Sequence, residues 1–289
     1  MAAGDALLGG TSVVVTGAGS GLGRAYCVAL AAAGANVLAV DLDEQRLHAT
    51  VALVRSTGGS VHPYLRAVGG REDAVAIVAA CLEAFGALDG FVANAGVLNP
   101  GLSRDLREET VDATLRTNVA GVWHCCVAAM DVMVPQGSGS IVTVVSGSMA
   151  GLDNLALYGT SKAAVLGMTY GLALELEGSG VRINAVSPLA NTPMSADMDI
   201  DDAFKGGAPE TVAPVVVHLV SRRSHDLHGQ VVRFDGHSLG LVAPPRLAVT
   251  TAPRDGWSVD DIAAALAGPL HGSRVPVGLA TAPPPAIAD

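Results

Sequence analysis

A tyrosine and a lysine stand four residues apart in the segment YGTSK, from Tyr158 to Lys162, in a chain with only four tyrosines. Residues four apart share one face of a helix, so the lysine ammonium can lie near the tyrosine hydroxyl. A free tyrosine has a pKa of about 10, which is too high for proton transfer at neutral pH, and a nearby positive charge lowers it. The pair is therefore a candidate general acid and base. An ordinary helix with a solvated lysine is the alternative.

A glycine-rich segment, TGAGSGLG, follows the first apolar run of the chain. Its glycines at positions 17, 21 and 23 would let the backbone approach a pyrophosphate, and a helix that begins there favours an anion at its N-terminus. The spacing differs from G-x-G-x-x-G because residue 22 is leucine. We interpret Gly17, Ser20, Gly21 and Leu22 as candidate cofactor-binding residues, with a purely structural turn as the alternative.

An aspartate, Asp41, ends the second apolar run, 18 residues after Gly23. A carboxylate at this place accepts hydrogen bonds from the adenosine ribose hydroxyls and repels a 2′-phosphate. Neither arginine nor lysine occupies the neighbouring positions 20, 22, 42 and 43. The sequence therefore predicts NAD rather than NADP as the cofactor.

Short apolar runs alternate with helical patterns along the first 240 residues. Continuous valine and isoleucine runs that alternate with helices indicate a parallel sheet covered on both faces. We predict a three-layer, doubly wound, Rossmann-like α/β fold, with its ligand at the carboxyl ends of the strands. Pro63 restricts its strand to an edge of the sheet. The predicted strands are 12–17, 36–41, 60–65, 90–94, 140–146, 181–187 and 230–236, and the predicted helices are 22–34, 43–58, 72–85, 106–133, 158–177 and 209–221.

The composition changes near residue 244, where prolines become frequent. We predict one domain over residues 1–243 and a proline-rich C-terminal extension over 244–289. The extension contains one helix signal, in which Ser258 and Asp261 fit a capping box and Trp257 and Ile262 fit a hydrophobic staple. It is therefore expected to be a tail with one short helix.

The charge and the cysteines limit the class of protein. The formal net charge of −10 argues against a nucleic-acid partner, which normally requires a basic patch. No signal-peptide pattern and no run of 18 apolar residues is present, so no membrane association is expected. The four cysteines have no metal-ligand spacing and are expected in the core, which predicts no metal site and a reducing, cytoplasmic setting.

These segments occur in the order and at the intervals found in the short-chain dehydrogenase/reductase family, which residues 8–240 resemble. The resemblance also includes ANAG (93–96), TNVAG (117–121), IVTVVS (141–146) and INAVSP (183–188). The chain is thus similar to a member of this family with a C-terminal extension. The family implies dimers or tetramers, and we expect a homotetramer.

The resemblance implies roles for four residues. Tyr158 would exchange a proton with a carbonyl or alcohol while nicotinamide exchanges the hydride. Lys162 would lower the pKa of the tyrosine and hold the nicotinamide ribose. Ser146 would hydrogen-bond the substrate oxygen, although Ser148 is an alternative because the interval from Ser146 to Tyr158 is short for the family. Asn118 would position a water near Lys162, and a purely structural bridge is the alternative.

Other positions follow the family pattern less closely. Asn94 and Gly96 match a nucleotide-facing segment. Val68 stands where the family commonly has an aspartate that contacts adenine. Leu189 replaces a glycine, and Thr192, the candidate contact to the carboxamide, comes one residue early. The nicotinamide side of the site is therefore expected to differ from the family.

Apolar side chains surround the predicted site and suggest a small hydrophobic alcohol or ketone as substrate. Core packing is the alternative for each of these residues. A narrower version of this function is acyl-chain reduction or steroid or terpenoid oxidation. A different class, a non-catalytic NAD-binding interaction or sensor protein, also stays open. The apolar residues are Met149, Leu152, Leu155, Leu157, Leu189, Met194 and Met198.

The helix predicted at 158–177 is apolar or small on nearly every side until Glu175. A helix that is apolar all round is buried, so a face that does not rest on the sheet needs another cover. Gly159, Gly167 and Gly171 would allow a second helix to approach. We expect a homo-oligomer built on this helix and the one before it, with the C-terminal tail as the alternative cover.

Overall fold

A computed structural model describes residues 6–194, 206–245, 256–268 and 270–273. Contacts divide the chain into two compact units, Met1–Val242 and Ala243–Asp289.

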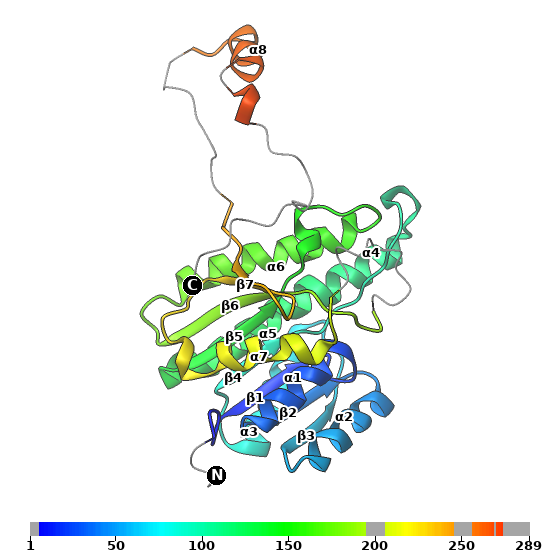
Figure 1. The fold of residues 1–289 in the computed structure, drawn as a ribbon, viewed down its shortest axis with the longest axis vertical. Coiled ribbons are helices and arrows are strands. Elements are labelled where there is room, and N and C mark those ends of the chain that lie inside the picture. The colour runs from blue at the N-terminus through cyan, green and yellow to red at the C-terminus, as the bar shows by residue number, and fades with distance from the viewer. Residues whose placement is uncertain (1–5, 195–205, 246–255, 269, 274–289) are drawn as a thin grey trace. The chain divides into compact units, whose positions relative to one another are not determined.

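Unit 1 is built on one eight-stranded sheet (Figure 1). The strand order is β3-β2-β1-β4-β5-β6-β7-β8, and every neighbouring pair is parallel except β7 with β8. The order reverses between β1 and β4, which is the point where doubly wound sheets bind ligands. The predicted fold class is confirmed, and β8 was not predicted. The strands are β1 Ser12–Thr16, β2 Asn36–Asp41, β3 Ser60–Leu65, β4 Gly90–Ala93, β5 Gly139–Val144, β6 Val181–Pro188, β7 Val231–Phe234 and β8 Leu239–Leu241.

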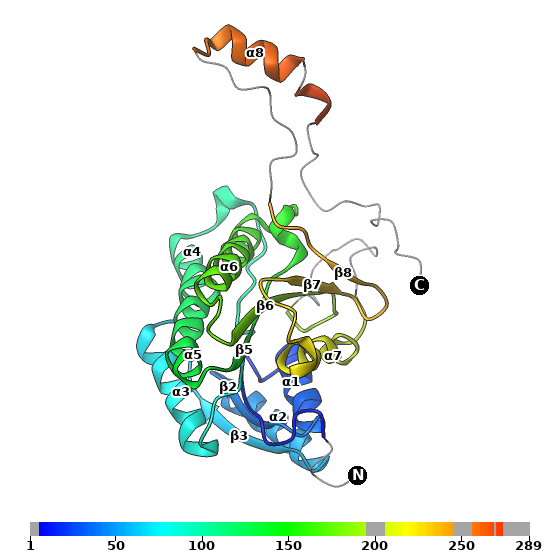
Figure 2. The ribbon, with the colours of Figure 1, turned by 90° about the vertical axis from the view of Figure 1, so that its left-hand side faces the viewer.

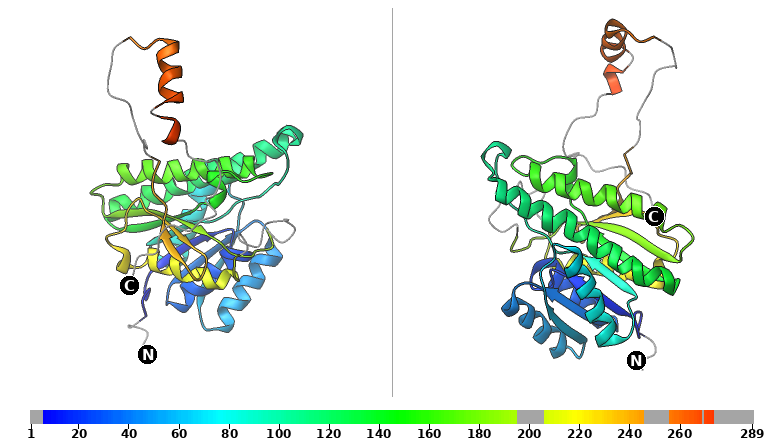
Figure 3. Two further views of the ribbon diagram at one scale, coloured as in Figure 1. Left: turned by 45° about the horizontal axis from the view of Figure 1, so that its top comes forward. Right: turned by 180° about the vertical axis from the view of Figure 1, so that it is seen from behind.

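Helices cover both faces of the sheet. Figure 2 shows α1, α2 and α7 on one side and α3, α4, α5 and α6 on the other, and the right-hand view of Figure 3 shows the second group in front of the strands. Two clusters of buried apolar side chains, one on each face, hold the three layers together. The helices are α1 Gly21–Ala32, α2 Glu44–Ser56, α3 Arg71–Phe85, α4 Glu108–Leu115, α5 Val122–Gln136, α6 Ala156–Glu175 and α7 Pro209–Val220.

The strands are apolar because both faces of the sheet are covered. All five residues of β1 are buried, and successive side chains enter opposite core clusters. Strand β3 carries Pro63 and lies at one edge of the sheet, as predicted. The proline therefore removes no hydrogen bond from the sheet interior.

One helical run, Glu108–Gln136, joins α4, a π-helical segment at Arg116–Gly121 and α5. The sequence predicted one uninterrupted helix here, and the π segment is a correction. Joined, the run is long and apolar enough to cross a membrane by length and composition, with 44% of its most apolar window buried. Because α5 packs in the core through Cys125, Cys126 and Met133, we interpret it as a core helix.

Unit 2 contains the helix α8, Val259–Ala267. The predicted capping box is present at its start. The Asp261 N–H donates to Ser258 Oγ (3.1 Å), and the Ser258 N–H donates to Asp261 Oδ2 (3.0 Å). The helix therefore satisfies two of its first amide groups locally.

Candidate active site

The glycine loop lies between the carboxyl end of β1 and the start of α1. Its N-cap residue, Ser20, makes no side-chain capping hydrogen bond to α1. The first amide groups of the helix therefore have no side-chain cap, and they form a natural site for a pyrophosphate. Gly17 and Gly21 have positive φ angles of 66° and 51°, which favour glycine. This geometry fits the phosphates of a dinucleotide.

The loop has no room for side chains where it turns. A Cβ on Gly23 would collide with the carbonyl oxygen of Gly17, and a Cβ on Gly17 would lie 2.9 Å from the Cα of Ala95. The glycines thus let α1 approach the strand end closely, which is the packing that a dinucleotide-binding turn requires.

Asp41 ends β2 beside the glycine loop. Its Oδ2 accepts the Gly19 N–H (2.7 Å), and its Oδ1 accepts the Asp43 N–H (2.9 Å). Each carboxylate oxygen has a further lone pair for a ligand hydroxyl. The side chain is therefore placed to meet a ribose next to the loop.

Two arginines near this loop were not considered in the sequence analysis. Arg24 donates to the carbonyl oxygen of Gly19 (2.5 Å) and to Thr50 Oγ1 (3.1 Å). Arg46 forms an ion pair with Asp43 (3.2 Å) on the exposed side of α2. Both guanidinium groups already have protein partners. Arg24 directly follows the glycine segment in the sequence, whereas the fold brings Arg46 beside the loop.

Asn94 connects the ends of β1 and β4. Its amide nitrogen donates to the carbonyl oxygens of Thr16 (2.9 Å) and Gly17 (3.3 Å). The hydroxyl of Thr16, a buried residue absent from the sequence prediction, accepts the N–H groups of Asn94 (3.1 Å) and Ala95 (3.0 Å). These bonds fix the strand ends on which the cofactor would lie.

Tyr158 lies in the first turn of α6, close to Ser146, which comes two residues after the end of β5. Burial raises the pKa of Tyr158 to about 12, and a hydrogen bond with Ser146 lowers it in part. The sequence predicted that the charge of Lys162 lowers this pKa, and burial reverses the direction. Ser146 Oγ accepts the Ser148 N–H (3.2 Å), so its own proton is free to be donated.

Ser148, the alternative serine, is buried, and its hydroxyl has no partner among the described residues. Its carbonyl oxygen would collide with a Cβ on Gly159. This packing against α6 explains the glycine at position 159, which the sequence analysis had assigned to a helix interface. The hydrogen bond to Tyr158 supports Ser146 over Ser148.

Lys162 is only 3% exposed, with its Nζ 5.6 Å from the centre of the Tyr158 ring. The ammonium donates to the carbonyl oxygen of Val144 (2.8 Å). Burial lowers the pKa of Lys162 to about 8. The predicted helical pair is thus present, with a lysine that can lose its proton at moderately alkaline pH.

Asn118 lies in the π-helical segment and is fully buried. Its Oδ1 accepts the Val97 N–H (2.8 Å), and its Nδ2 donates to the Val97 carbonyl oxygen (2.9 Å) and to Ser161 Oγ (3.0 Å). A Cβ on Gly96 would lie 3.2 Å from Asn118 Oδ1 and 3.7 Å from Lys162 Nζ. The structure thus brings the loop after β4 next to Asn118 and Lys162.

The segment after β6 reaches the glycine loop from the other side. A Cβ on Gly21 would lie 3.3 Å from the Cβ of Thr192. The Leu189 N–H donates to the Phe234 carbonyl oxygen (2.9 Å), so the residue that replaces the family glycine continues the pairing of β6 with β7. Thr192 therefore borders the predicted phosphate site.

Val68 packs against the π-helical segment. A Cβ on Gly121 would lie 2.7 Å from Val68 Cγ1. The position that is commonly aspartate in the family is therefore occupied by an apolar side chain that contributes to the core on this side of the site.

The apolar residues predicted near the substrate divide into two groups. Leu155 is 5% exposed and belongs to the core, as the alternative held. Met194 is 47% exposed, and Leu152, Leu157 and Met149 are partly exposed. Met198 lies outside the described residues.

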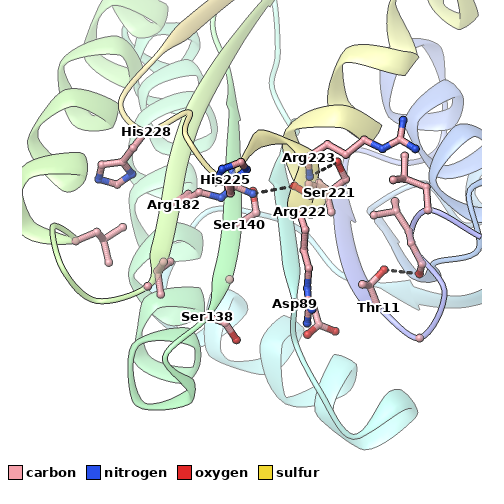
Figure 4. Close-up of a pocket in the computed structure, with 18 of the residues that line it drawn as sticks. Thr11, Asp89, Ser138, Ser140, Arg182, Ser221, Arg222, Arg223, His225 and His228 are labelled. Carbon is pink, nitrogen blue, oxygen red and sulfur yellow. Dashed lines mark hydrogen bonds between the residues drawn. The ribbon is translucent and has the colours of Figure 1, made fainter.

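A cavity of about 860 Å³ lies at the opposite edge of the sheet, at the amino ends of β1, β4, β5 and β6 (Figure 4). Arg182 donates there to the carbonyl oxygens of Leu219 (3.1 Å), Ser221 (3.2 Å) and Leu227 (3.4 Å). Arg222 and Arg223 follow α7 directly, where positive charge complements the carbonyl end of a helix. We therefore interpret the polar side chains around this cavity as structural groups that stabilise the C-terminal end of α7.

The cysteines are buried free thiols, as predicted. Burial raises the pKa of all four, for Cys81 and Cys125 to about 12. The described residues contain no group of three or more histidine, cysteine, aspartate or glutamate side chains that could hold a metal ion.

A family model described as "short chain dehydrogenase" matches residues 11–202. The 3-oxoacyl-[acyl-carrier-protein] reductase FabG of Thermotoga maritima is 35% identical over 246 residues, which cover 81% of this chain and 99% of the relative. The levodione reductase of Leifsonia aquatica is 35% identical and covers 78% of this chain and 92% of the relative.

Solved structures show the same similarity. A crystal structure of levodione reductase matches with a TM-score of 0.75 and 31% identity, over 79% of this chain and 97% of that one. A short chain dehydrogenase from Mycobacterium avium matches with a TM-score of 0.85 and 27% identity, over 94% of this chain and 99% of that one. The second match covers more of this chain than unit 1 contains.

Proposed function

Because the chain belongs to the short-chain dehydrogenase/reductase family and is an oxidoreductase acting on CH–OH groups, we propose that it interconverts a hydrophobic secondary alcohol and its ketone with NAD. The observation that carries the proposal is the cluster of Ser146, Tyr158 and Lys162 at the carboxyl edge of the sheet, beside a glycine loop that fits a dinucleotide. Family membership and this cluster together argue against the non-catalytic alternative.

The proposed mechanism assigns the proton to Tyr158. During ketone reduction its phenol donates a proton to the carbonyl oxygen, and during alcohol oxidation its phenolate accepts one. Ser146, which already hydrogen-bonds Tyr158, orients the same oxygen. The bound cofactor would supply or accept the hydride, and its oxidised ring carries a positive charge that favours the phenolate.

NAD is proposed over NADP because of Asp41. Its carboxylate lies beside the loop that would hold the phosphates, and the nearby guanidinium groups of Arg24 and Arg46 are paired within the protein. Gly17, Ser20, Gly21, Leu22, Asn94, Gly96 and Thr192 are the other residues proposed to hold the cofactor, with Val68 bordering its adenine end.

The proposal is tested by following NADH absorbance with a panel of carbonyl compounds. The panel should contain levodione, cyclohexanone and acetoacetyl-CoA, with a sugar phosphate as a charged control. We expect turnover with at least one uncharged ketone and none with the sugar phosphate. Turnover restricted to acetoacetyl-CoA would replace the ketone proposal with acyl-chain reduction, and activity with NADPH alone would overturn the choice of NAD.

The pH dependence of ketone reduction should follow the protonation state of Lys162. The Tyr158 phenol keeps its proton throughout the neutral range because its pKa is raised to about 12. Lys162, whose pKa is lowered to about 8, is charged below that pH and neutral above it. We therefore expect kcat/KM to be flat from about pH 6 and to fall above about pH 8.

A Lys162→Arg variant gives the matched control for this profile. A guanidinium keeps its charge at every accessible pH. The fall above about pH 8 should therefore disappear in the variant, even where its maximal rate is lower. An identical fall in both proteins would show that another group causes it.

We also propose a homo-oligomer, a dimer or tetramer, built on α5 and α6. Space around Gly167 and Gly171 is open, and Trp123 and Leu174 are 44% and 74% exposed. Light scattering at micromolar protein should give a multiple of 29.0 kDa, and the same number of subunits should persist after deletion of residues 245–289. A monomer would refute the oligomer. A cytoplasmic location stays a prediction.

A further inference from the structure

Three elements meet where Asn118 lies. They are the loop after β4 that carries Gly96, the π-helical segment between α4 and α5, and the first turns of α6 that carry Tyr158 and Lys162. A π-helical segment inserts an extra residue into a helix and often marks a functional site. Such an irregular turn depends on its surroundings to keep one arrangement.

Both N–H groups of the Asn118 side chain and its oxygen are hydrogen-bonded within the protein. Both of its N–H groups have acceptors, the carbonyl oxygen of Val97 and the hydroxyl of Ser161, and its oxygen accepts the Val97 N–H. No amide hydrogen is left for a ligand. The side chain therefore acts as a brace between the loop, the π-helical segment and α6.

Ser161 supplies the α6 end of this brace. It is fully buried, and its Oγ accepts from Asn118 (3.0 Å) while donating to the carbonyl oxygen of Tyr158 (2.7 Å). Among the described residues of α6, Ser161 is the one whose side chain hydrogen-bonds the π-helical segment. The hydroxyl thus links Asn118 directly to the helical turn that presents Tyr158.

We propose that Ser161 is a positioning residue, which holds Asn118 and the adjoining loop in register with Tyr158 and Lys162. This inference rests on the catalytic roles proposed above for Tyr158 and Lys162. Without the hydroxyl, one N–H of Asn118 loses its acceptor in a buried site, and the π-helical segment and α6 lose their direct hydrogen bond. Small displacements of catalytic groups reduce the rate strongly, since 1 Å can cost about 10²-fold.

The simpler explanation is local. A serine in a helix often bonds a carbonyl oxygen one turn earlier, and the bond from Ser161 to Tyr158 has this form. That explanation predicts a loss of stability without a specific loss of rate. A test must therefore separate the two effects.

Thr169 provides a matched control on the same helix. It is also fully buried, donates to the carbonyl oxygen of Val165 (2.8 Å) and shares a hydrogen bond with Thr143 Oγ1 (2.8 Å). Thr169→Val removes a buried hydroxyl with the same type of bonds, and Ser161→Ala removes the one beside Asn118. Both variants should still bind NADH with a Kd within about twofold of the unaltered protein.

Turnover should then differ between the two variants. With a ketone from the panel above, we expect kcat to fall about 10-fold in Ser161→Ala with KM nearly unchanged, and to change less than about twofold in Thr169→Val. Ser161→Cys, which keeps a weak acceptor of similar size, should recover part of the loss. Equal losses in Ser161→Ala and Thr169→Val, or a kcat of Ser161→Ala within twofold of the unaltered protein, would overturn the proposal.

A double-mutant cycle tests whether Ser161 acts through Asn118. In an Asn118→Ala background, Ser161→Ala should reduce kcat by less than about twofold, because the partner is already gone. Additive losses would refute positioning through Asn118. If Asn118→Ala does not fold, the proposal is still tested by whether kcat decreases from the unaltered protein to Ser161→Cys and then to Ser161→Ala. Full turnover of Tyr158→Phe would instead refute the proposed function itself.

Discussion

Tyr158→Phe is expected to reduce turnover by at least about 10²-fold while NADH binding persists. The substitution removes the hydroxyl that would carry the proton and keeps the ring, and general acid–base help is worth about 10²–10⁴-fold. The ring lies against Lys162 and the hydroxyl against Ser146, so the surrounding packing should be retained. Steady-state rates and NADH fluorescence titration measure the two properties separately.

The two serines give the control for this experiment. Ser146 hydrogen-bonds Tyr158, whereas the hydroxyl of Ser148 has no partner among the described residues. Ser146→Ala should therefore lower kcat far more than Ser148→Ala. A Tyr158→Phe variant with turnover near that of the unaltered protein would refute the assignment of the proton to Tyr158, and a larger loss in Ser148→Ala would exchange the serines.

The layers of the fold could be predicted because local signals are strong in this chain. Continuous valine runs belong to strands covered on both faces, and Pro63 identifies an edge strand. Strand β8 is only three residues long and its leucines are exposed, so no buried pattern marks it. The π-helical segment was missed for another reason, since a single extra residue shifts the phase of the helical pattern without ending it.

The sequence predicted which residues form the site better than it predicted their pKa values and hydrogen bonds. Motif spacing indicates Tyr158 and Lys162, but the pKa of Tyr158 depends on burial by residues distant in sequence. Burial dominates here and raises the pKa, although the positive charge of Lys162 had suggested the opposite. Thr16 and Ser161 carry hydrogen bonds that join separate elements, and their types and positions alone give no signal of this.

The cofactor preference should reverse when the charge at the end of β2 is reversed. In the double variant Asp41→Ala, Leu42→Arg, a carboxylate that repels a 2′-phosphate is lost and a guanidinium that binds one is added. Leu42 is 72% exposed, so an arginine has room there. A hydrogen bond to a charged group contributes about 1.5–3 kcal/mol, so the ratio of the two Kd values should shift at least about 10-fold toward NADPH.

Asp41 has a second role that this variant also removes, because it accepts the Gly19 and Asp43 N–H groups. The double variant should therefore bind NADH more weakly than the unaltered protein even as NADPH binding improves.

Asp41→Asn separates the two roles, since an amide oxygen still accepts one of these hydrogen bonds while the charge is gone. Its preference for NADH should weaken, with a smaller loss of stability than in a variant with alanine at position 41, because one of the two hydrogen bonds is kept. Equal binding of NADH and NADPH by the unaltered protein, in fluorescence titrations at fixed ionic strength, would refute the role of Asp41. An unchanged preference in Asp41→Asn would show that the shape of the loop selects the cofactor, and the charge does not.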